Sequence, residues 1–172
     1  MRKALSLFVC LLLLVLSCCQ QQKVEYTPNY VFRKGYTARL VHGKALAPSQ
    51  APARIKRAIA AANKIVGRPY RRGGGHGRHW DRAYDCSGSV AFVLREAGML
   101  RKNTSPTSGD FLRWGRPGFG KWLTVYVKRG HVFLLIAGLR FDTTGSGSGV
   151  GPRWYSKPRP CSGFKVRHIP GY

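Results

Sequence analysis

The chain has 172 residues, of which 44% are hydrophobic and 12% aromatic, so it can form one domain with a buried core. This composition argues against a wholly disordered chain. Lys and Arg total 30 against 6 for Asp and Glu, which gives a formal net charge of +24. A chain with this charge is expected to bind polyanions such as nucleic acid, anionic lipid or cell-wall polymer, and charge alone does not select among them.

The N-terminus has the pattern of a secretory leader. Arg2 and Lys3 precede an almost unbroken apolar run that ends at Ser17. A helix of this length spans roughly 21 Å, short of the ~30 Å hydrocarbon core, so residues 1–17 are predicted to be a signal peptide. The run ends in VLSC, which resembles a bacterial lipobox, and we expect lipidation at Cys18, with Cys19 as the rival acceptor. The alternative is an ordinary signal peptide that releases a soluble secreted protein.

The pattern after the leader predicts a linker and then two helices. Residues 18–50 have no clear period and are predicted to be a tether, with a short strand near Val31 or Leu40-Val41. Apolar residues at helical spacing predict a first helix over 51–66, and the same spacing predicts a second helix from Cys86 to Ala97, with Asp85 at its N-cap. Residues 51–172 are expected to form the folded domain.

The second half of the domain reads as strands. Strands are predicted over 123–127, 131–137 and 139–144, with turns at 128–130 and near Gly138. A flexible loop, GSGSGVGP, follows, and Trp154 and FKVRHI are candidates for an edge strand. Two helices followed by a meander predict an α+β fold with helices packed on an antiparallel sheet.

Cys86 and Cys161 are the cysteines left in the predicted domain. In an oxidising compartment they could form a disulfide. Cys86 can instead be a reactive thiol, because the unpaired N–H groups at a helix start stabilise a thiolate. Cys161 is then expected to be a free thiol, or to pair with Cys19.

A nucleophilic cysteine needs a base, and the base needs an orienting group. His131 opens an apolar strand, and Asp142 follows on the next strand. If the chain turns at Ala137-Gly138, His131 faces Thr144, and Asp142 is its diagonal neighbour on the same face of the sheet. A loop longer or shorter by one residue would move Asp142 to the other face. Asp142 can also simply pair with Arg140 or Arg153.

Three segments resemble the NlpC/P60 family of papain-like cysteine peptidases, which hydrolyse peptide bonds in peptidoglycan stems. The sequence YDCSGSV at 84–90 resembles the family's DCSG motif, GRPY at 67–70 with the glycine pair at 73–74 resembles its G-x-P-Y-x-x-GG segment, and GHV at 130–132 resembles its G-H-V strand. The likeness covers about residues 54–172.

The resemblance implies a papain-like NlpC/P60 fold and a cell-wall cysteine peptidase. It implies Cys86 as the nucleophile, His131 as the base and Asp142 as the orienting residue. We expect substrate contacts from four residues near the nucleophile, of which Tyr70 is a hydroxyl donor by family analogy and Arg72 a carboxylate ligand: Tyr70, Arg72, Asp85 and Ser87. The protein would act as a lipid-anchored, monomeric enzyme of the cell envelope.

Other functions compete with this hypothesis. An N-acetylmuramoyl-L-alanine amidase would share the Cys-His pair and cut the sugar–peptide amide. A non-catalytic envelope protein would bind wall polymer through its charge alone. Nucleic-acid binding is disfavoured by the leader and by the lack of a basic recognition helix. No cofactor is expected, and the ligand-type residues His76, His79 and Asp81 are too few for a structural zinc site.

Overall fold

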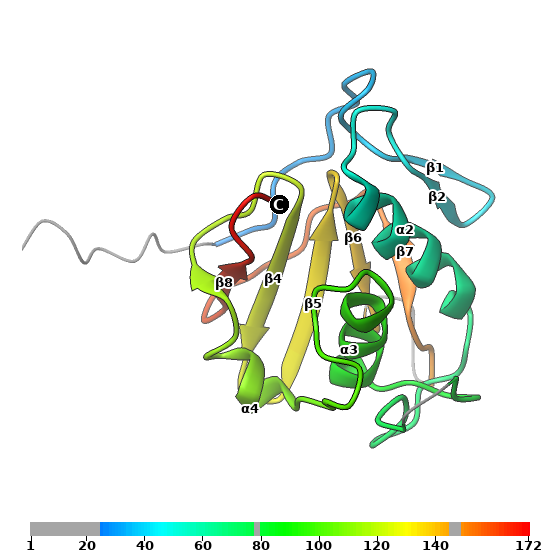
Figure 1. The fold of residues 1–172 in the computed structure, drawn as a ribbon, viewed down its shortest axis with the longest axis vertical. Helices are drawn as coiled ribbons and strands as arrows, with labels where there is room; N and C mark the ends of the chain where they lie inside the picture. Colours follow the sequence, from blue (N-terminus) through cyan, green and yellow to red (C-terminus); the bar gives the residue numbers. More distant parts are fainter. Residues whose placement is uncertain (1–24, 78–79, 145–148) are drawn as a thin grey trace, which may run out of the picture.

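The fold is an antiparallel sheet with helices on one face, as the computed structural model shows (Figure 1). The structure describes residues 25–77, 80–144 and 149–172. In chain order the elements are β1 (Arg39–Val41), β2 (Lys44–Leu46), α2 (Ala53–Ile65), α3 (Cys86–Glu96), α4 (Ser108–Phe111), β3 (Arg116–Pro117), β4 (Leu123–Lys128), β5 (His131–Ile136), β6 (Leu139–Asp142), β7 (Arg153–Tyr155) and β8 (Lys165–His168).

Six strands form the main sheet, in the order β3-β8-β4-β5-β6-β7, and every neighbouring pair is antiparallel. Strands β4 to β7 are a meander, and β1 and β2 form a separate hairpin. The predicted α+β class with an antiparallel sheet is therefore confirmed.

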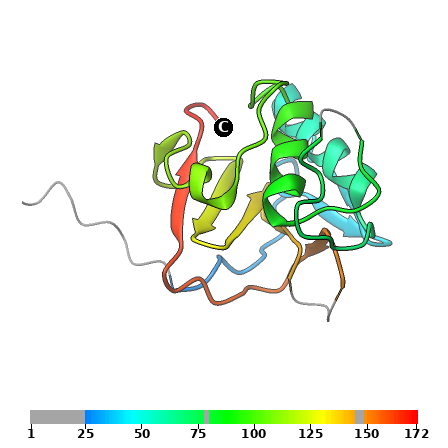
Figure 2. The same ribbon diagram turned by 90° about the horizontal axis from the view of Figure 1, so that it is seen from below.

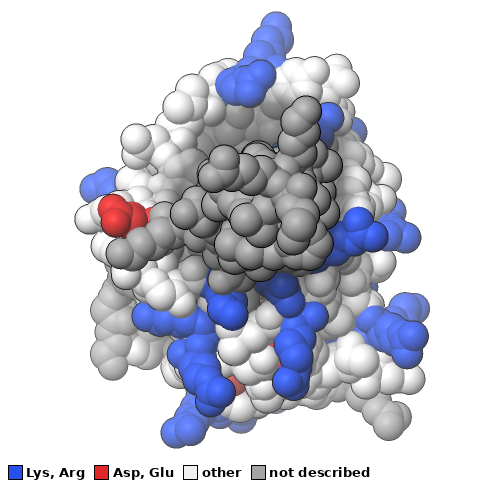
Figure 3. All heavy atoms as spheres, turned by 90° about the vertical axis from the view of Figure 1, so that its left-hand side faces the viewer, with Lys and Arg blue, Asp and Glu red and all other residues white. Residues whose placement is uncertain are grey.

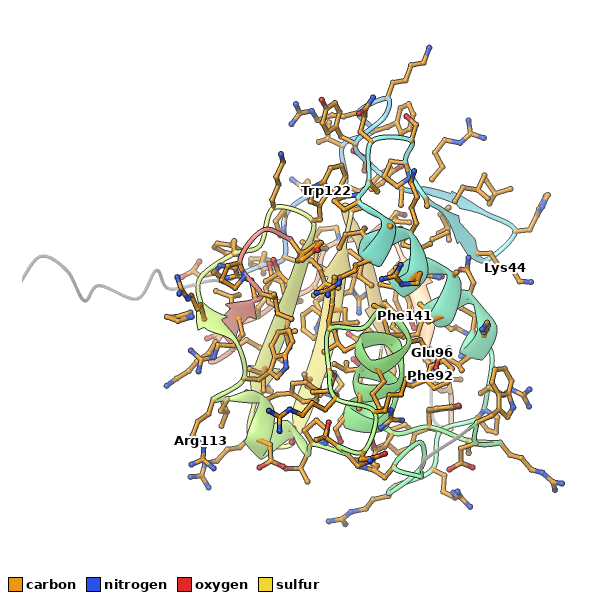
Figure 4. The ribbon with its side chains drawn as sticks, viewed as in Figure 1. Lys44, Phe92, Glu96, Arg113, Trp122 and Phe141 are labelled. Carbon is orange, nitrogen blue, oxygen red and sulfur yellow. The ribbon has the colours of Figure 1, made fainter. Side chains whose placement is uncertain are left out.

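The two faces of the sheet are covered differently. Because side chains alternate along a strand, Val132, Leu134 and Ile136 of β5 face the core shared with α2 and α3, whereas Phe133 belongs to a second cluster on the opposite face. Phe92 of α3 and Phe141 of β6 belong to the helix-side core (Figure 4). On the opposite face, the N-terminal segment and the chain after β7 run beneath the sheet (Figure 2).

The two long helices and the three central strands lie close to their predicted bounds. Strand β7 is an edge strand as predicted, but β8 pairs with both β3 and β4 and is an inner strand. Helix α4 and strand β3 were not predicted from the sequence. A two-residue strand and a single helical turn are too short to produce a readable hydrophobic period.

The part of the predicted tether that the structure describes is packed against the domain. Thr27 and Ala38 are buried, the backbone N–H of Ala38 donates to the carbonyl of Ala137 at 2.8 Å, and β1 includes the expected strand at Leu40-Val41. The prediction of a linker over 18–50 is thus wrong for residues 25–50, because these polar and Pro-rich residues are held by backbone hydrogen bonds that carry no sequence period.

The predicted leader over 1–17 and the predicted lipidation at Cys18 lie outside the described residues. Within residues 25–77, 80–144 and 149–172, no helix has the length and apolar character needed to cross a bilayer.

Candidate active site

Cys86 is the first residue of α3, and its position follows from the residue before it. The carboxylate of Asp85 accepts hydrogen bonds from the backbone N–H of Gly88 at 2.7 Å and of Gly73 at 2.9 Å, so it caps the helix and fixes the preceding loop. Cys86 is a free thiol and is 7% exposed. The helix start directs unpaired backbone N–H groups and the positive end of the helix dipole towards its sulfur.

His131 and Asp142 meet across the β5–β6 hairpin. Leu134 pairs with Phe141 and Ile136 with Leu139, which is the register expected for a turn at Ala137-Gly138. In this register Asp142 is the diagonal neighbour of His131, and the Nε2–H of His131 donates to Oδ1 of Asp142 at 2.9 Å. The condition placed on the loop length in the sequence analysis is therefore met.

The imidazole of His131 also lies within hydrogen-bonding reach of the Cys86 thiol. Burial would lower the pKa of His131, but the hydrogen bonds with Asp142 and Cys86 outweigh it and raise that pKa to about 9. Because Nε2 is bound to Asp142, Nδ1 is the ring nitrogen free to face the sulfur. The geometry thus brings together a thiol, an imidazole and a carboxylate, the three groups expected to act as nucleophile, base and orienting residue.

Asp142 is fully enclosed and bound by two guanidinium groups as well as by the imidazole. Nη1 of Arg140 lies 2.7 Å from Oδ2, and Nη1 of Arg159 lies 2.6 Å from the same oxygen. Oδ1 also accepts from the backbone N–H of Thr144 at 3.1 Å. Burial would raise the pKa of Asp142, but the neighbouring imidazole and the two guanidiniums hold it well below its usual range. Asp142 is therefore anionic and rigidly oriented.

Arg140 was anticipated as a partner of Asp142, and Arg159 was not. Arg159 lies in the segment between β7 and β8, where the sequence has no hydrophobic period that would predict a helix or a strand. The only signal available was the charge balance, since a buried carboxylate needs nearby cations.

Cys161 lies on the opposite face of the sheet from the helices. It is buried beside Tyr126, Phe133 and Phe164, and its thiol lies 3.2 Å from the carbonyl oxygen of Arg159. Both cysteines of the described chain are free. A disulfide between Cys86 and Cys161 is therefore ruled out, whereas a pairing of Cys161 with Cys19 falls on a residue outside the described ones.

The four predicted substrate contacts fall into two groups. Tyr70 is 41% exposed, and burial and the nearby Cys86 and Asp85 raise the pKa of its hydroxyl, so it lies on the nucleophile's side of the domain. Arg72 is exposed and close enough to Tyr70 to counter that rise. Both side chains are therefore exposed and lie on the same side of the domain as Cys86.

Asp85 and Ser87 are instead engaged with each other. The hydroxyl of Ser87 donates to Asp85 at 3.0 Å, and both residues are buried. His76 lies 3.1 Å from Asp85 through Nε2 and 2.9 Å from Ser105 through Nδ1. These side chains support the loop and the start of α3, a role that was not predicted for His76 from the sequence.

Over the described ranges, no three His, Cys, Asp or Glu side chains are grouped so as to hold a metal ion. Comparison of the chain with family models, with curated proteins and with solved structures gave no match.

Proposed function

We propose that the protein is a cysteine peptidase of the NlpC/P60 type, with a papain-like fold, that hydrolyses an amide bond in peptidoglycan stem peptides. The observation that carries the proposal is the contact of Cys86, at a helix start, with His131, whose other ring nitrogen binds Asp142. The DCSG and G-H-V likenesses contain Cys86 and His131 of this arrangement, and the G-x-P-Y likeness contains Tyr70, which lies near Cys86.

The reaction follows from these three groups. The Cys86 thiolate attacks the carbonyl carbon of the scissile amide, and the oxyanion is held by backbone N–H groups at the start of α3. The imidazolium of His131 gives its Nδ1 proton to the leaving amine, which departs and leaves a thioester on Cys86. His131 then takes a proton from water, the hydroxide releases the acid, and the sulfur recovers the thiolate form. Asp142 keeps Nε2 protonated throughout.

Arg72 is better placed than its neighbours Arg68 and Arg71 to bind a carboxylate of the stem peptide. Arg71 is already bound to Asp81 at 3.0 Å, and Arg68 lies over the ring of Trp80. Arg72 is exposed and near Tyr70, so its guanidinium can take a carboxylate next to the nucleophile.

The positive net charge of the protein supports its location at a polyanionic surface. Figure 3 shows Lys and Arg spread over one face of the molecule, with few acidic side chains among them. Glu96 forms an ion pair with Lys64, and all four Asp residues of the chain accept hydrogen bonds within the fold, namely Asp81, Asp85, Asp110 and Asp142. Together with the leader and the lipobox-like end at Cys18, this favours an enzyme anchored in the cell envelope and facing the wall.

The test is digestion of purified cell wall by the wild type, by Cys86→Ala and by Cys161→Ala, with mass spectrometry of the soluble fragments. We expect new amino and carboxyl ends with the wild type and Cys161→Ala, and none with Cys86→Ala. Release of whole stem peptides from the sugar would indicate the amidase instead.

A wild type that binds wall in a salt-sensitive manner but produces no new ends would overturn the enzyme proposal. The protein would then be a basic envelope protein that holds wall polymer by charge.

A further inference from the structure

Arg159 approaches the candidate active site on the face of the sheet opposite the helices. The segment that carries it runs under the sheet beside the N-terminal segment (Figure 2). The N–H of Thr27 donates to the carbonyl of Arg159 at 3.0 Å, the N–H of Arg159 donates to Oγ1 of Thr27 at 2.9 Å, and the N–H of Cys161 donates to the carbonyl of Glu25 at 2.6 Å. Residues 25–27 therefore fix the backbone of Arg159.

The guanidinium of Arg159 is held by two aromatic rings and by polar groups of the site. Its guanidinium lies over the rings of Phe133 and Phe164, at 5.0 and 5.4 Å from their centroids. Nη1 is 2.6 Å from Oδ2 of Asp142, 2.6 Å from Oγ1 of Thr144 and 3.4 Å from Nε2 of His131. One cation thus touches the orienting carboxylate and stands next to the imidazole.

Charged and titratable groups approach His131 from each neighbouring element of the described structure. They are Cys86 of α3, Lys128 of β4, Asp142 of β6 with Arg140 bound to it, and Arg159. Lys128 is paired with His131 in register, but its ammonium group lies over the ring of Phe164. Arg159 differs from the others because it binds Asp142 and also approaches Nε2.

We propose that Arg159 is a positioning residue that shares Asp142 with His131 and so limits how tightly the imidazolium holds its proton, and that residues 25–27 place it there. A carboxylate shared among several cations attracts each of them less. The inference rests on the proposed function, in which His131 must release its proton to the leaving amine. It gives the segment that follows the predicted anchor a role in the chemistry.

The test follows the titration of His131 by NMR of histidine-labelled protein, in a Cys86→Ala background that removes coupling to the thiol. The signal is assigned by its loss in His131→Gln. Arg159→Met keeps an unbranched apolar stem between the two phenylalanine rings and removes the charge. We expect its His131 midpoint to rise by about one pH unit, a tenfold drop in the acid dissociation constant. The His131 midpoint should rise less in Arg159→Lys.

The matched control is Lys157→Met, which removes an exposed cation from the same segment and should leave the midpoint unchanged. A midpoint in Arg159→Met that stays the same or falls overturns the proposal. If that variant does not fold by circular dichroism, Arg159→Gln replaces it with the same expected direction.

Thr27→Val tests the placement by residues 25–27, since it removes the hydroxyl that accepts from Arg159 at nearly constant shape. We expect a smaller rise in the same direction, and no rise would overturn the placement. The titration does not depend on wall cleavage. If the wild type does not cleave wall but Arg159→Met still raises the His131 midpoint, only the proposed function is refuted. If the wild type cleaves wall but Arg159→Met leaves the midpoint unchanged, only this inference is refuted.

Discussion

His131 and Asp142 lie diagonally across the β5–β6 hairpin, on the same face of the sheet, with Nε2 and Oδ1 2.9 Å apart. The relationship depends on the turn, where Ala137 and Gly138 both have positive φ, at 46° and 86°. A turn with two such residues matches the right-handed twist of the flanking strands and sets the register. The orientation of the His131 imidazole is thus coupled to a turn at the opposite end of both strands.

Asp142→Asn should lower the rate of wall cleavage by about two to four orders of magnitude, because an amide neither stabilises the imidazolium nor enforces one tautomer. Initial rates of release of new amino groups give the measurement. Glu96→Gln is the control, since its ion pair with Lys64 is exposed and worth little. Equal rates for the wild type and Asp142→Asn would remove Asp142 from the mechanism.

The stability of the fold should fall at alkaline pH. The raised pKa of His131 means that its contribution is complete below its ordinary pKa of 6.5 and is lost as the pH rises through about 9. We expect the free energy of unfolding to decline by roughly 1 to 3 kcal/mol over this window. Asp142→Asn removes the partner and should flatten the decline. Urea unfolding from pH 6 to 9.5 tests this, and parallel curves for the two proteins would contradict it.

Gly88→Ala should destabilise the fold and displace the loop at Gly74. A Cβ on Gly88 would lie 2.0 Å from the carbonyl oxygen of Gly74, a backbone atom that cannot move alone. Overpacking of this kind typically costs about 1 to 3 kcal/mol. Gly77→Ala is the matched control, because its Cβ would meet no atom within 4 Å. Similar urea midpoints for the two variants would show that the loop yields freely.

Tyr70→Phe should lower the maximal rate about 10- to 1,000-fold while KM changes little, if its hydroxyl donates to the oxyanion beside Cys86. Steady-state kinetics on a soluble stem-peptide substrate separates the two constants. Tyr36→Phe is the control, since Tyr36 stacks on Trp122 near the Ala137-Gly138 turn, away from the start of β5. A change confined to KM would make Tyr70 a binding residue only.

The predictions from sequence were best where a local period exists. Apolar residues are regularly spaced in helices α2 and α3 and in strands β4 to β6. Asp85 marks the start of α3 as an N-cap, so the position of Cys86 at a helix start was predictable from the sequence. The pairing of His131 with Asp142 was predictable only under a condition on the turn, because one residue more or less reverses the face of a strand.

The surroundings of the site were not predictable in this way. Arg159 is 28 residues from His131 and lies in a segment without a period, where its backbone is held by Thr27. Ser87 was expected at the substrate, and the fold turns it to Asp85 instead.

The α+β class, the helix that carries Cys86 and the strands that carry His131 and Asp142 could be predicted from the sequence, because they depend on spacing between near neighbours. The cations around Asp142, the position of β8 in the sheet and the packing of residues 25–50 became known only from the folded structure. Those features arise from contacts between segments far apart in the chain, and neither propensity nor periodicity encodes them.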